Sequence, residues 1–159
     1  RAYLRMLEKE AGMPMIFLDF FAAEFDVDCV ISNNFYGMYT ATRHLIKKGH
    51  KKIAYVGSVK SSNSIADRYC DQTASVLIHE LEGNGYRVPE DVSVVGYDNF
   101  VFMPVCDVAI TTYGVDMPEM AKAAAERIIS RVKGLDKGPG RLSIISGNLI
   151  DGESVRALI

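Results

Sequence analysis

Short apolar runs alternate with amphipathic segments along most of this chain, and this pattern limits the possible fold more than any other feature. The runs Met15–Phe20 and Cys29–Ser32 are short and nearly continuous in apolar residues. Such runs are typical of strands that are buried on both faces of a parallel sheet. The segment from about Phe35 to Lys48 repeats apolar residues at helical spacing. This alternation predicts an α/β fold with mostly parallel sheets flanked by helices.

The same patterns predict the remaining elements. Further strands are expected over Lys52–Gly57, Val92–Tyr97, Ile110–Tyr113, Leu142–Ile145 and Asn148–Ile150. Further helices are expected over Arg1–Ala11, from Asp71 to about Leu81, and from Met117 to about Val132. The last helix follows a capping-box sequence, in which the side chain of Asp116 can accept a hydrogen bond from the first turn.

Composition and charge exclude several classes of protein. The 159 residues suit one domain or two small lobes. A net charge of -2 argues that this segment does not hold a nucleic acid by itself, because such binding needs a concentrated basic face. Three cysteines without CxxC spacing favour a reducing compartment, so a cytoplasmic protein is expected. No apolar run approaches the roughly 20 residues of a membrane helix.

The sequence lacks the common motifs of enzymes and metal sites. His44, His50 and His79 are far apart, and none is paired with a cysteine or carboxylate at ligand spacing. There is no GxSxG elbow, phosphate-binding loop or GxGxxG motif. We therefore expect no catalytic activity, no cofactor and no metal.

Two charged residues near the ends of predicted strands are better candidates for a binding site. Ligands of open α/β sheets sit beyond the carboxyl ends of the strands, where Arg68 and Asp98 are expected. An Arg and an Asp that face one cleft can donate to and accept from hydroxyls, which suits a sugar or a nucleoside. A salt bridge or two surface charges is the alternative. Phe35, Tyr36 and Tyr97 could stack on a sugar ring, although aromatics of this kind are more often simply core residues.

Several longer stretches resemble the lactose/galactose repressor (LacI/GalR) family. The most specific is VPEDVSVVGYD within Tyr86–Asn99, which is close to the family's "G..VPeDvSVvGfDd". Other matching stretches are Arg43–Gly57 ("HLI..GH..IA.i.G"), Asn33-Asn34 with Gly37 ("DN..G"), Ile110-Thr111-Thr112 ("lTT") and a worn Asp151–Arg156 ("..R.S"). The resemblance covers nearly the whole chain.

This resemblance implies a bacterial transcription regulator. Family members carry a helix-turn-helix headpiece and a two-lobed domain like the periplasmic sugar-binding proteins, and a small effector between the lobes changes operator affinity. By matching positions, Arg68 and Asp98 correspond to the family's cleft arginine and aspartate. Cys70-Asp71 matches an Asn-Asp pair whose Asn faces the ligand, although a thiol is a poor hydrogen-bond partner. The predicted effector contacts are Arg68, Asp98, Tyr36, Phe35, Cys70 and Asp71.

The resemblance also predicts how the chain is divided. Residues 1–69 are expected in the N-terminal lobe, 70–110 in the C-terminal lobe, and 111–159 in the crossover back to the N-terminal lobe and the C-terminal end. The headpiece is absent from this sequence. Family members have further strands and helices where Tyr69 joins Cys70 here. Either that segment is deleted, which would expose strand edges and apolar faces, or the sequence joins pieces of a longer chain.

The sequence thus predicts a ligand-sensing domain of a cytoplasmic regulator. Its expected partners are a sugar-like effector, operator DNA through a headpiece, and a second copy in a homodimer, without a membrane. A solute-binding protein of a sugar transporter has the same fold and is the first alternative. An α/β enzyme is the second, and turnover of a sugar or nucleoside that is lost on Asp98→Asn would support it.

Overall fold

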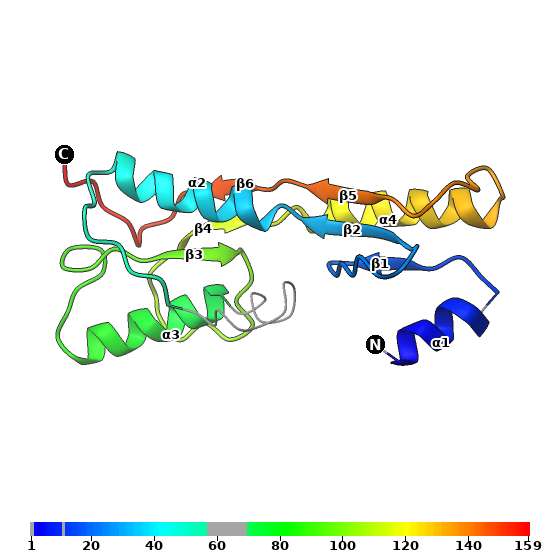
Figure 1. Ribbon diagram of the computed structural model, residues 1–159. Coiled ribbons are helices and arrows are strands. Elements are labelled where there is room, and N and C mark those ends of the chain that lie inside the picture. The colour runs from blue at the N-terminus through cyan, green and yellow to red at the C-terminus, as the bar shows by residue number, and fades with distance from the viewer. Residues whose placement is uncertain (1, 11, 57–69) are drawn as a thin grey trace. The chain divides into compact units, whose positions relative to one another are not determined.

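The computed structural model describes residues 2–10, 12–56 and 70–159 (Figure 1). The chain forms two compact units, and each unit contains one sheet. Unit 1 consists of Arg1–Ser32 with Asp116–Ile145, and unit 2 of Asn33–Val115 with Ser146–Ile159. The chain therefore passes from one unit to the other three times, after Ser32, Val115 and Ile145.

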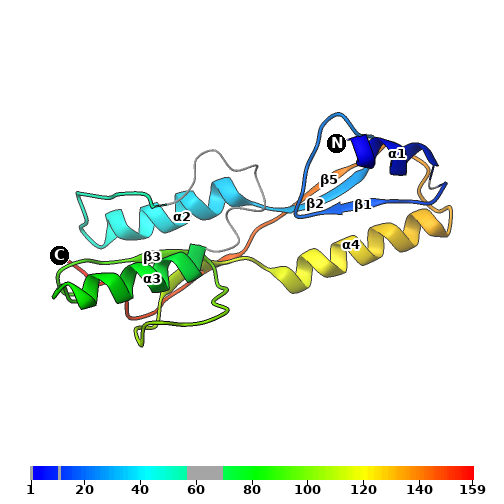
Figure 2. The same ribbon diagram turned by 90° about the horizontal axis from the view of Figure 1, so that it is seen from below.

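Unit 1 is built on a fully parallel sheet. Its elements are α1 (Ala2–Glu10), β1 (Ile16–Leu18), β2 (Asp28–Ser32), α4 (Met117–Val132) and β5 (Leu142–Ile145). The strand order is β1-β2-β5, so β2 lies in the centre. Helix α4 packs against all three strands and runs along the sheet in Figure 2. Helix α4 begins as the capping box predicts, because Asp116 accepts a hydrogen bond from the Glu119 N–H at 3.0 Å.

The two faces of this sheet are covered differently. Phe17 and Cys29 occupy paired positions on β1 and β2, and both belong to an apolar cluster with Phe25. The rings of Phe17 and Phe25 meet edge to face with centroids 5.7 Å apart. Asp28 points to the opposite face, since neighbouring strand residues alternate, and there it meets Arg131 of α4.

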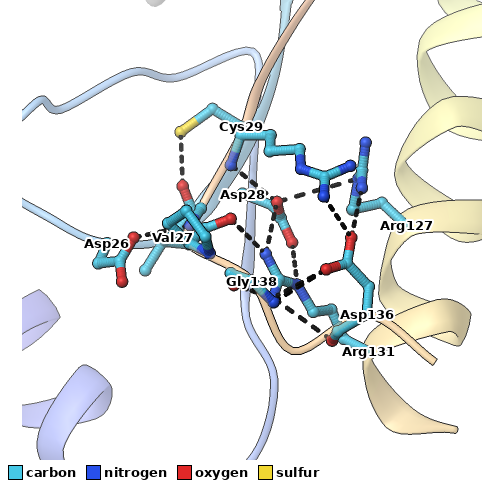
Figure 3. A network of polar contacts seen from close by, with 11 residues as sticks. Asp26, Val27, Asp28, Cys29, Arg127, Arg131, Asp136 and Gly138 are labelled. Carbon is cyan, nitrogen blue, oxygen red and sulfur yellow. Dashed lines mark hydrogen bonds and ion pairs between the residues drawn. The ribbon is translucent and has the colours of Figure 1, made fainter. Parts of the chain in front are cut away.

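A network of ion pairs fixes the C-terminal half of α4 to β2 (Figure 3). Arg131 donates two hydrogen bonds to the carboxylate of Asp28, at 2.7 and 3.1 Å, and also donates to the carbonyl oxygen of Gly138. Arg127 donates to Asp136 at 2.9 Å. Burial alone would raise the pKa of Asp28, but the hydrogen bonds from Arg131 and the Arg141 N–H, together with the arginine charges, lower it.

Unit 2 is built on a mixed sheet. Its elements are α2 (Asn34–Lys47), α3 (Cys70–Gly83), β3 (Val95–Asp98), β4 (Thr111–Gly114) and β6 (Asn148–Ile150). The order is β3-β4-β6, in which β3 and β4 are parallel and β6 is antiparallel to β4. Ala74, Ile78, Val88 and Val94 form the core cluster on the α3 side, and Ile78 is fully buried.

Helices α2 and α3 cover opposite faces of the unit 2 sheet. On β3, the hydroxyl of Tyr97 donates to Asn34 at the start of α2. The neighbouring Gly96 faces Asp71 at the start of α3. On β4, Thr112 likewise bonds Asp71, and the next residue, Tyr113, lies against α2. Alternation along two paired strands therefore separates the helices.

The predicted fold class is confirmed, and most predicted elements lie within a few residues of the observed ones. One predicted strand is wrong. Residues 51–56 form no strand, and the side chains of Ile53, Tyr55 and Val56 are 43%, 54% and 58% exposed. An apolar run becomes a strand only when a neighbouring strand pairs with it, and hydrophobicity alone does not supply that partner. Gly57, the last residue of that prediction, lies outside the described residues.

The two units also divide the chain differently from the lobes expected above. Helix α2 was expected in the N-terminal lobe with residues 1–32, but it packs on the sheet that contains β3 and β4. Residues 146–159 also belong to unit 2. Asn33, the first residue of unit 2, caps α2, with its side chain accepting from the Tyr36 N–H at 3.2 Å.

Candidate functional site

Both helix N-termini of unit 2 lie at the carboxyl edge of its parallel strands. Tyr97, near the end of β3, donates to the Asn34 side chain at 2.9 Å and so brings the start of α2 to this edge. On the other face, Asp71 in the first turn of α3 lies against Gly96. In open α/β sheets, the edge where helices leave opposite faces is the usual place for a ligand. We therefore take this edge as the candidate site.

Asp71 is the most buried charged group at this edge, with 1% of its surface exposed. Its carboxylate accepts a hydrogen bond from the Thr112 hydroxyl at 2.9 Å. Burial raises the pKa of Asp71 to about 6, although hydrogen bonds from Thr112 and from the backbone of Tyr97, Asn99 and Phe100 oppose the shift. The side chain therefore joins α3 to the ends of β3 and β4.

Gly96 makes this close approach possible. A Cβ added at Gly96 would lie 1.7 Å from a carboxylate oxygen of Asp71, a distance that no side chain tolerates. Gly96 and Tyr97 of the VPEDVSVVGYD stretch thus have different structural roles. Glycine admits the carboxylate on one face, and tyrosine packs towards α2 on the other.

Asp98 lies at the end of β3 in a strained turn. Asp98 and Asn99 have φ angles of 91° and 58°, in the left-handed region that non-glycine residues rarely adopt. One carboxylate oxygen of Asp98 accepts from the Phe100 N–H at 2.7 Å. This turn re-aims the chain at the carboxyl edge, and strain of this kind is concentrated at functional sites.

The α2 face of the edge is aromatic. The rings of Tyr97 and Tyr113 stack with centroids 5.5 Å apart, and Tyr36 meets Tyr113 edge-on at 6.5 Å. Gly37 lets α2 approach, because a Cβ there would lie 2.6 Å from the ring of Tyr97. Tyr97 and Tyr113 are therefore core residues, whereas Tyr36 remains 48% exposed.

The structure brings some of the predicted site residues together. Asp71 and Asp98 are joined at one edge, through the backbone of the turn that follows β3. Tyr36 lies on the other face, against Tyr113, and Phe35 is 86% exposed. Arg68 and the side chain of Cys70 lie outside the described residues, although Cys70 is the first residue of α3. The effector contacts themselves stay predictions.

Sequence reasoning did not single out Thr112 or Asn34, which hold Asp71 and Tyr97. Thr112 belongs to the ITT segment, so its position in a matching stretch was the available signal. Within the described ranges, no three His, Cys, Asp or Glu side chains gather in a way that could hold a metal ion. The helices of those ranges are also too short or too polar to cross a membrane.

Two family models together match almost the whole chain. One, described as a periplasmic binding protein-like domain, matches residues 65–155. The other, described as periplasmic binding proteins and sugar binding domain of the LacI family, matches residues 2–70. The chain belongs to the LacI family of periplasmic-binding-protein-like domains. The two matches meet at residues 65–70, around the junction of Tyr69 and Cys70.

Curated relatives of this LacI-family domain are repressors. It is 26% identical over 184 residues to the HTH-type transcriptional repressor PurR of Aliivibrio fischeri strain MJ11, covering 84% of the chain and 55% of the relative. It is 22% identical over 176 residues to the ribose operon repressor of Haemophilus influenzae, covering 80% and 53%. The chain thus spans about half the length of these relatives. Both alignments are longer than the 159-residue chain, so the relatives contain positions without a counterpart here.

Solved structures show the same fold. A transcription regulator from Lactobacillus plantarum matches with a TM-score of 0.83 at 18% identity, covering 99% of this chain and 78% of that one. The LacI family transcriptional regulator CCPA from Weissella paramesenteroides, solved with bound sucrose, matches with a TM-score of 0.80 at 21% identity, covering 100% and 75%. The predicted family resemblance is confirmed, and these relatives are transcriptional regulators.

Proposed function

We propose that this LacI-family domain is the ligand-sensing part of a bacterial transcription regulator. It binds a sugar-like effector and thereby controls the affinity of a separate headpiece for operator DNA. The observation that carries the proposal is the carboxyl edge of unit 2, where the starts of α2 and α3 and the strained Asp98 turn come together. The sugar-binding description of the matched family supports the choice of effector.

The proposed effector contacts are hydrogen-bonding groups around this edge. Asp98 accepts from effector hydroxyls, and Arg68 donates to the effector, as the family resemblance implies. Tyr36 and Phe35 are exposed at the start of α2 and can stack on a sugar ring. Cys70 replaces the family's asparagine, so this protein loses one amide contact. Asp71 acts from the interior by holding the end of β3.

The proposed edge is close in sequence to two of the crossings between the units. Asn33, which caps α2, follows the crossing after Ser32, and Val115 directly follows β4. An effector bound here would favour one of two conformations by its difference in affinity for them. The shift would then change the spacing of two headpieces on an operator. The net charge of -2 is consistent with DNA contacts that lie outside this domain.

We also propose that the regulator is a cytoplasmic homodimer. Support comes from exposed apolar side chains in the segment after β3, where Phe102 and Met103 are 76% and 64% exposed. Gln72 of α3 holds this segment through two hydrogen bonds to the backbone of Met103, at 2.8 and 3.0 Å. In a dimeric regulator, a second copy of the chain would cover this surface.

Calorimetric titration with D-ribose, D-glucose, sucrose and cellobiose tests the effector proposal. At least one sugar should bind, and Asp98→Asn or Arg68→Ala should weaken it by about tenfold or more, since a hydrogen bond to a charged group contributes roughly 1.5–3 kcal/mol. Asp107→Asn removes an exposed carboxylate of the same unit and serves as the matched control. Equal affinity in wild type, Asp98→Asn and Arg68→Ala would contradict the assignment.

The transporter alternative is disfavoured because the relatives are repressors. The full-length protein distinguishes the two functions. Binding to an operator that responds to a sugar supports the regulator, and capture of a sugar without any DNA binding supports the transporter protein.

A further inference from the structure

A hollow in unit 2 runs along helix α2. It has a volume of about 250 Å³. Its lining includes Tyr36, Tyr39, Arg43, His44, Lys47 and Leu149. The helical residues recur every three or four positions, so they form one face of α2. Leu149 pairs with Tyr113 across β4 and β6, which places β6 beside this face. We call this hollow the α2 pocket.

Two cations of the α2 pocket are available for an anion. Arg43 donates to the hydroxyl of Tyr39 at 3.1 Å, and its guanidinium carbon lies 5.8 Å from the centre of that ring. The contact orients the guanidinium, and its other N–H groups have no hydrogen-bond partner within residues 2–10, 12–56 and 70–159. Lys47 lies one helical turn further along. Neither cation forms an ion pair with another residue of the described ranges, so neither charge is compensated there.

The other polar side chains in the wall of the α2 pocket are Thr40, whose hydroxyl donates to the Tyr36 carbonyl oxygen at 2.8 Å, and His44. The Nε2 atom of His44 lies 3.6 Å from a carboxylate oxygen of Asp151, and its side chain is only 13% exposed. Burial lowers the pKa of His44, and the neighbouring lysines act in the same direction, while Asp151 opposes them. The imidazole therefore adds little positive charge at pH 7. The pocket thus has two cations in its lining, and the carboxylate of Asp151 beside His44 is 75% exposed.

The other walls of the α2 pocket are apolar. The rings of Tyr36 and Tyr39 have centroids 6.5 Å apart and are tilted by 32°, and Leu149 lies on the side of β6. Such rings offer faces on which a flat ligand group can stack. The pocket thus combines a cationic end with an aromatic wall.

We propose that the α2 pocket binds a small phosphate monoester that carries a ring. Arg43 and Lys47 hold the phosphate, because a guanidinium matches its oxygens with two parallel hydrogen bonds and an ammonium adds a point charge. The ring packs against Tyr36 and Tyr39. Tyr36 belongs to both this site and the proposed effector edge, but the two cations favour an anion here, whereas the carboxylate of Asp98 favours neutral hydroxyl groups there. A second metabolite could therefore be sensed by the same unit.

Calorimetric titration of the whole chain at low salt tests this proposal with phenyl phosphate, inorganic phosphate and phenol. Phenyl phosphate should bind at least tenfold more tightly than either fragment. The double variant Arg43→Gln/Lys47→Gln should lose about tenfold or more in affinity, because charged hydrogen bonds are removed. Lys133→Gln/Lys137→Gln removes the same charge from exposed positions of unit 1 and should change nothing. Asp151→Asn should tighten binding by a few fold, since it removes the nearby negative charge.

Three results would overturn the proposal. They are the absence of phenyl phosphate binding, binding that survives in the Arg43/Lys47 variant, and equal loss in the Lys133/Lys137 control. If inorganic phosphate bound as tightly as phenyl phosphate, the ring would contribute nothing to binding, and that part of the proposal would be wrong. Circular dichroism melts show whether each variant is folded, and Asp151→Asn gives an outcome of opposite sign that misfolding cannot produce.

Discussion

Each unit of this domain buries one aspartate almost completely, and the surroundings shift the pKa values of the two carboxylates in opposite directions. Asp28 in unit 1 is 3% exposed and Asp71 in unit 2 is 1% exposed. Arg131 faces Asp28 with two hydrogen bonds, and the pKa of Asp28 is lowered. Among the described residues, the groups that donate to Asp71 are neutral, namely the Thr112 hydroxyl and backbone N–H groups, and its pKa rises to about 6.

The comparison shows that a counter-charge lowers the pKa of a buried carboxylate that burial alone would raise. Neutral hydrogen bonds around Asp71 reduce the cost of burial without cancelling it. The two sites therefore respond to pH in opposite directions. Stability from Asp28 is present above its unfolded pKa and is lost as the pH falls through the lower folded value. Stability from Asp71 is greatest at low pH and declines as the pH rises from about 4 through about 6.

Removing the positive charge that faces Asp28 is expected to have the largest effect on stability. Arg131→Ala leaves buried Asp28 with only the more distant cation of Arg127, at 3.9 Å, and frees the carbonyl groups of Gly138 and Pro139. The free energy of unfolding at pH 7 should fall by about 3–5 kcal/mol. Urea denaturation measures it.

Arg141→Ala is the matched control for Arg131→Ala. Its side chain is 57% exposed and lies 3.5 Å from Asp136, so its loss should cost about 1 kcal/mol or less. Equal losses in the two variants would show that Arg131 does not compensate Asp28.

Replacing Asp71 by asparagine tests the buried carboxylate of unit 2. Asp71→Asn removes the titrating group, so the decline in unfolding free energy between pH 4 and 7 should be smaller than in wild type by on the order of 2 kcal/mol. Urea melts across this pH range provide the measurement. The same pH slope in both proteins would mean that another group titrates there.

Thr112→Val is expected to have the smallest effect. Valine keeps the shape of threonine but removes the hydroxyl that donates to Asp71 at 2.9 Å. The loss should be about 1–2 kcal/mol at pH 7, where the carboxylate is charged, and less at pH 5. A loss that does not change between the two pH values would contradict a charge-dependent role for this hydrogen bond. Thr42→Val, on the exposed side of α2, is the control.

The sequence predicted the regular elements well where local patterns decide them. The capping box predicted the start of α4, and the apolar runs predicted β5 and β6 with the observed bounds. The run over 52–57 failed because a strand depends on a distant partner. The sequence did not predict where the chain passes from one unit to the other, because no local sequence pattern distinguishes these crossings.

The candidate site was predicted only in part. Asp71 and Asp98 lie at one edge of the unit 2 sheet, but no local pattern showed that the carboxylate of Asp71 would be buried there. Its partner Thr112 is 41 residues away in sequence. The ion pair of Asp28 with Arg131 spans 103 residues and was missed for the same reason. Long-range polar contacts follow from packing, which a single sequence does not display.

Hydrogen exchange of the whole chain, with and without a sugar that binds in the calorimetric panel, tests the central claim most directly. Effector binding at the carboxyl edge of unit 2 should slow exchange in residues 95–100 and in the first turns of α2 and α3. It should leave β5 unchanged. Protection confined to other segments, or no protection at a saturating sugar concentration, would contradict the proposal that this edge senses the effector.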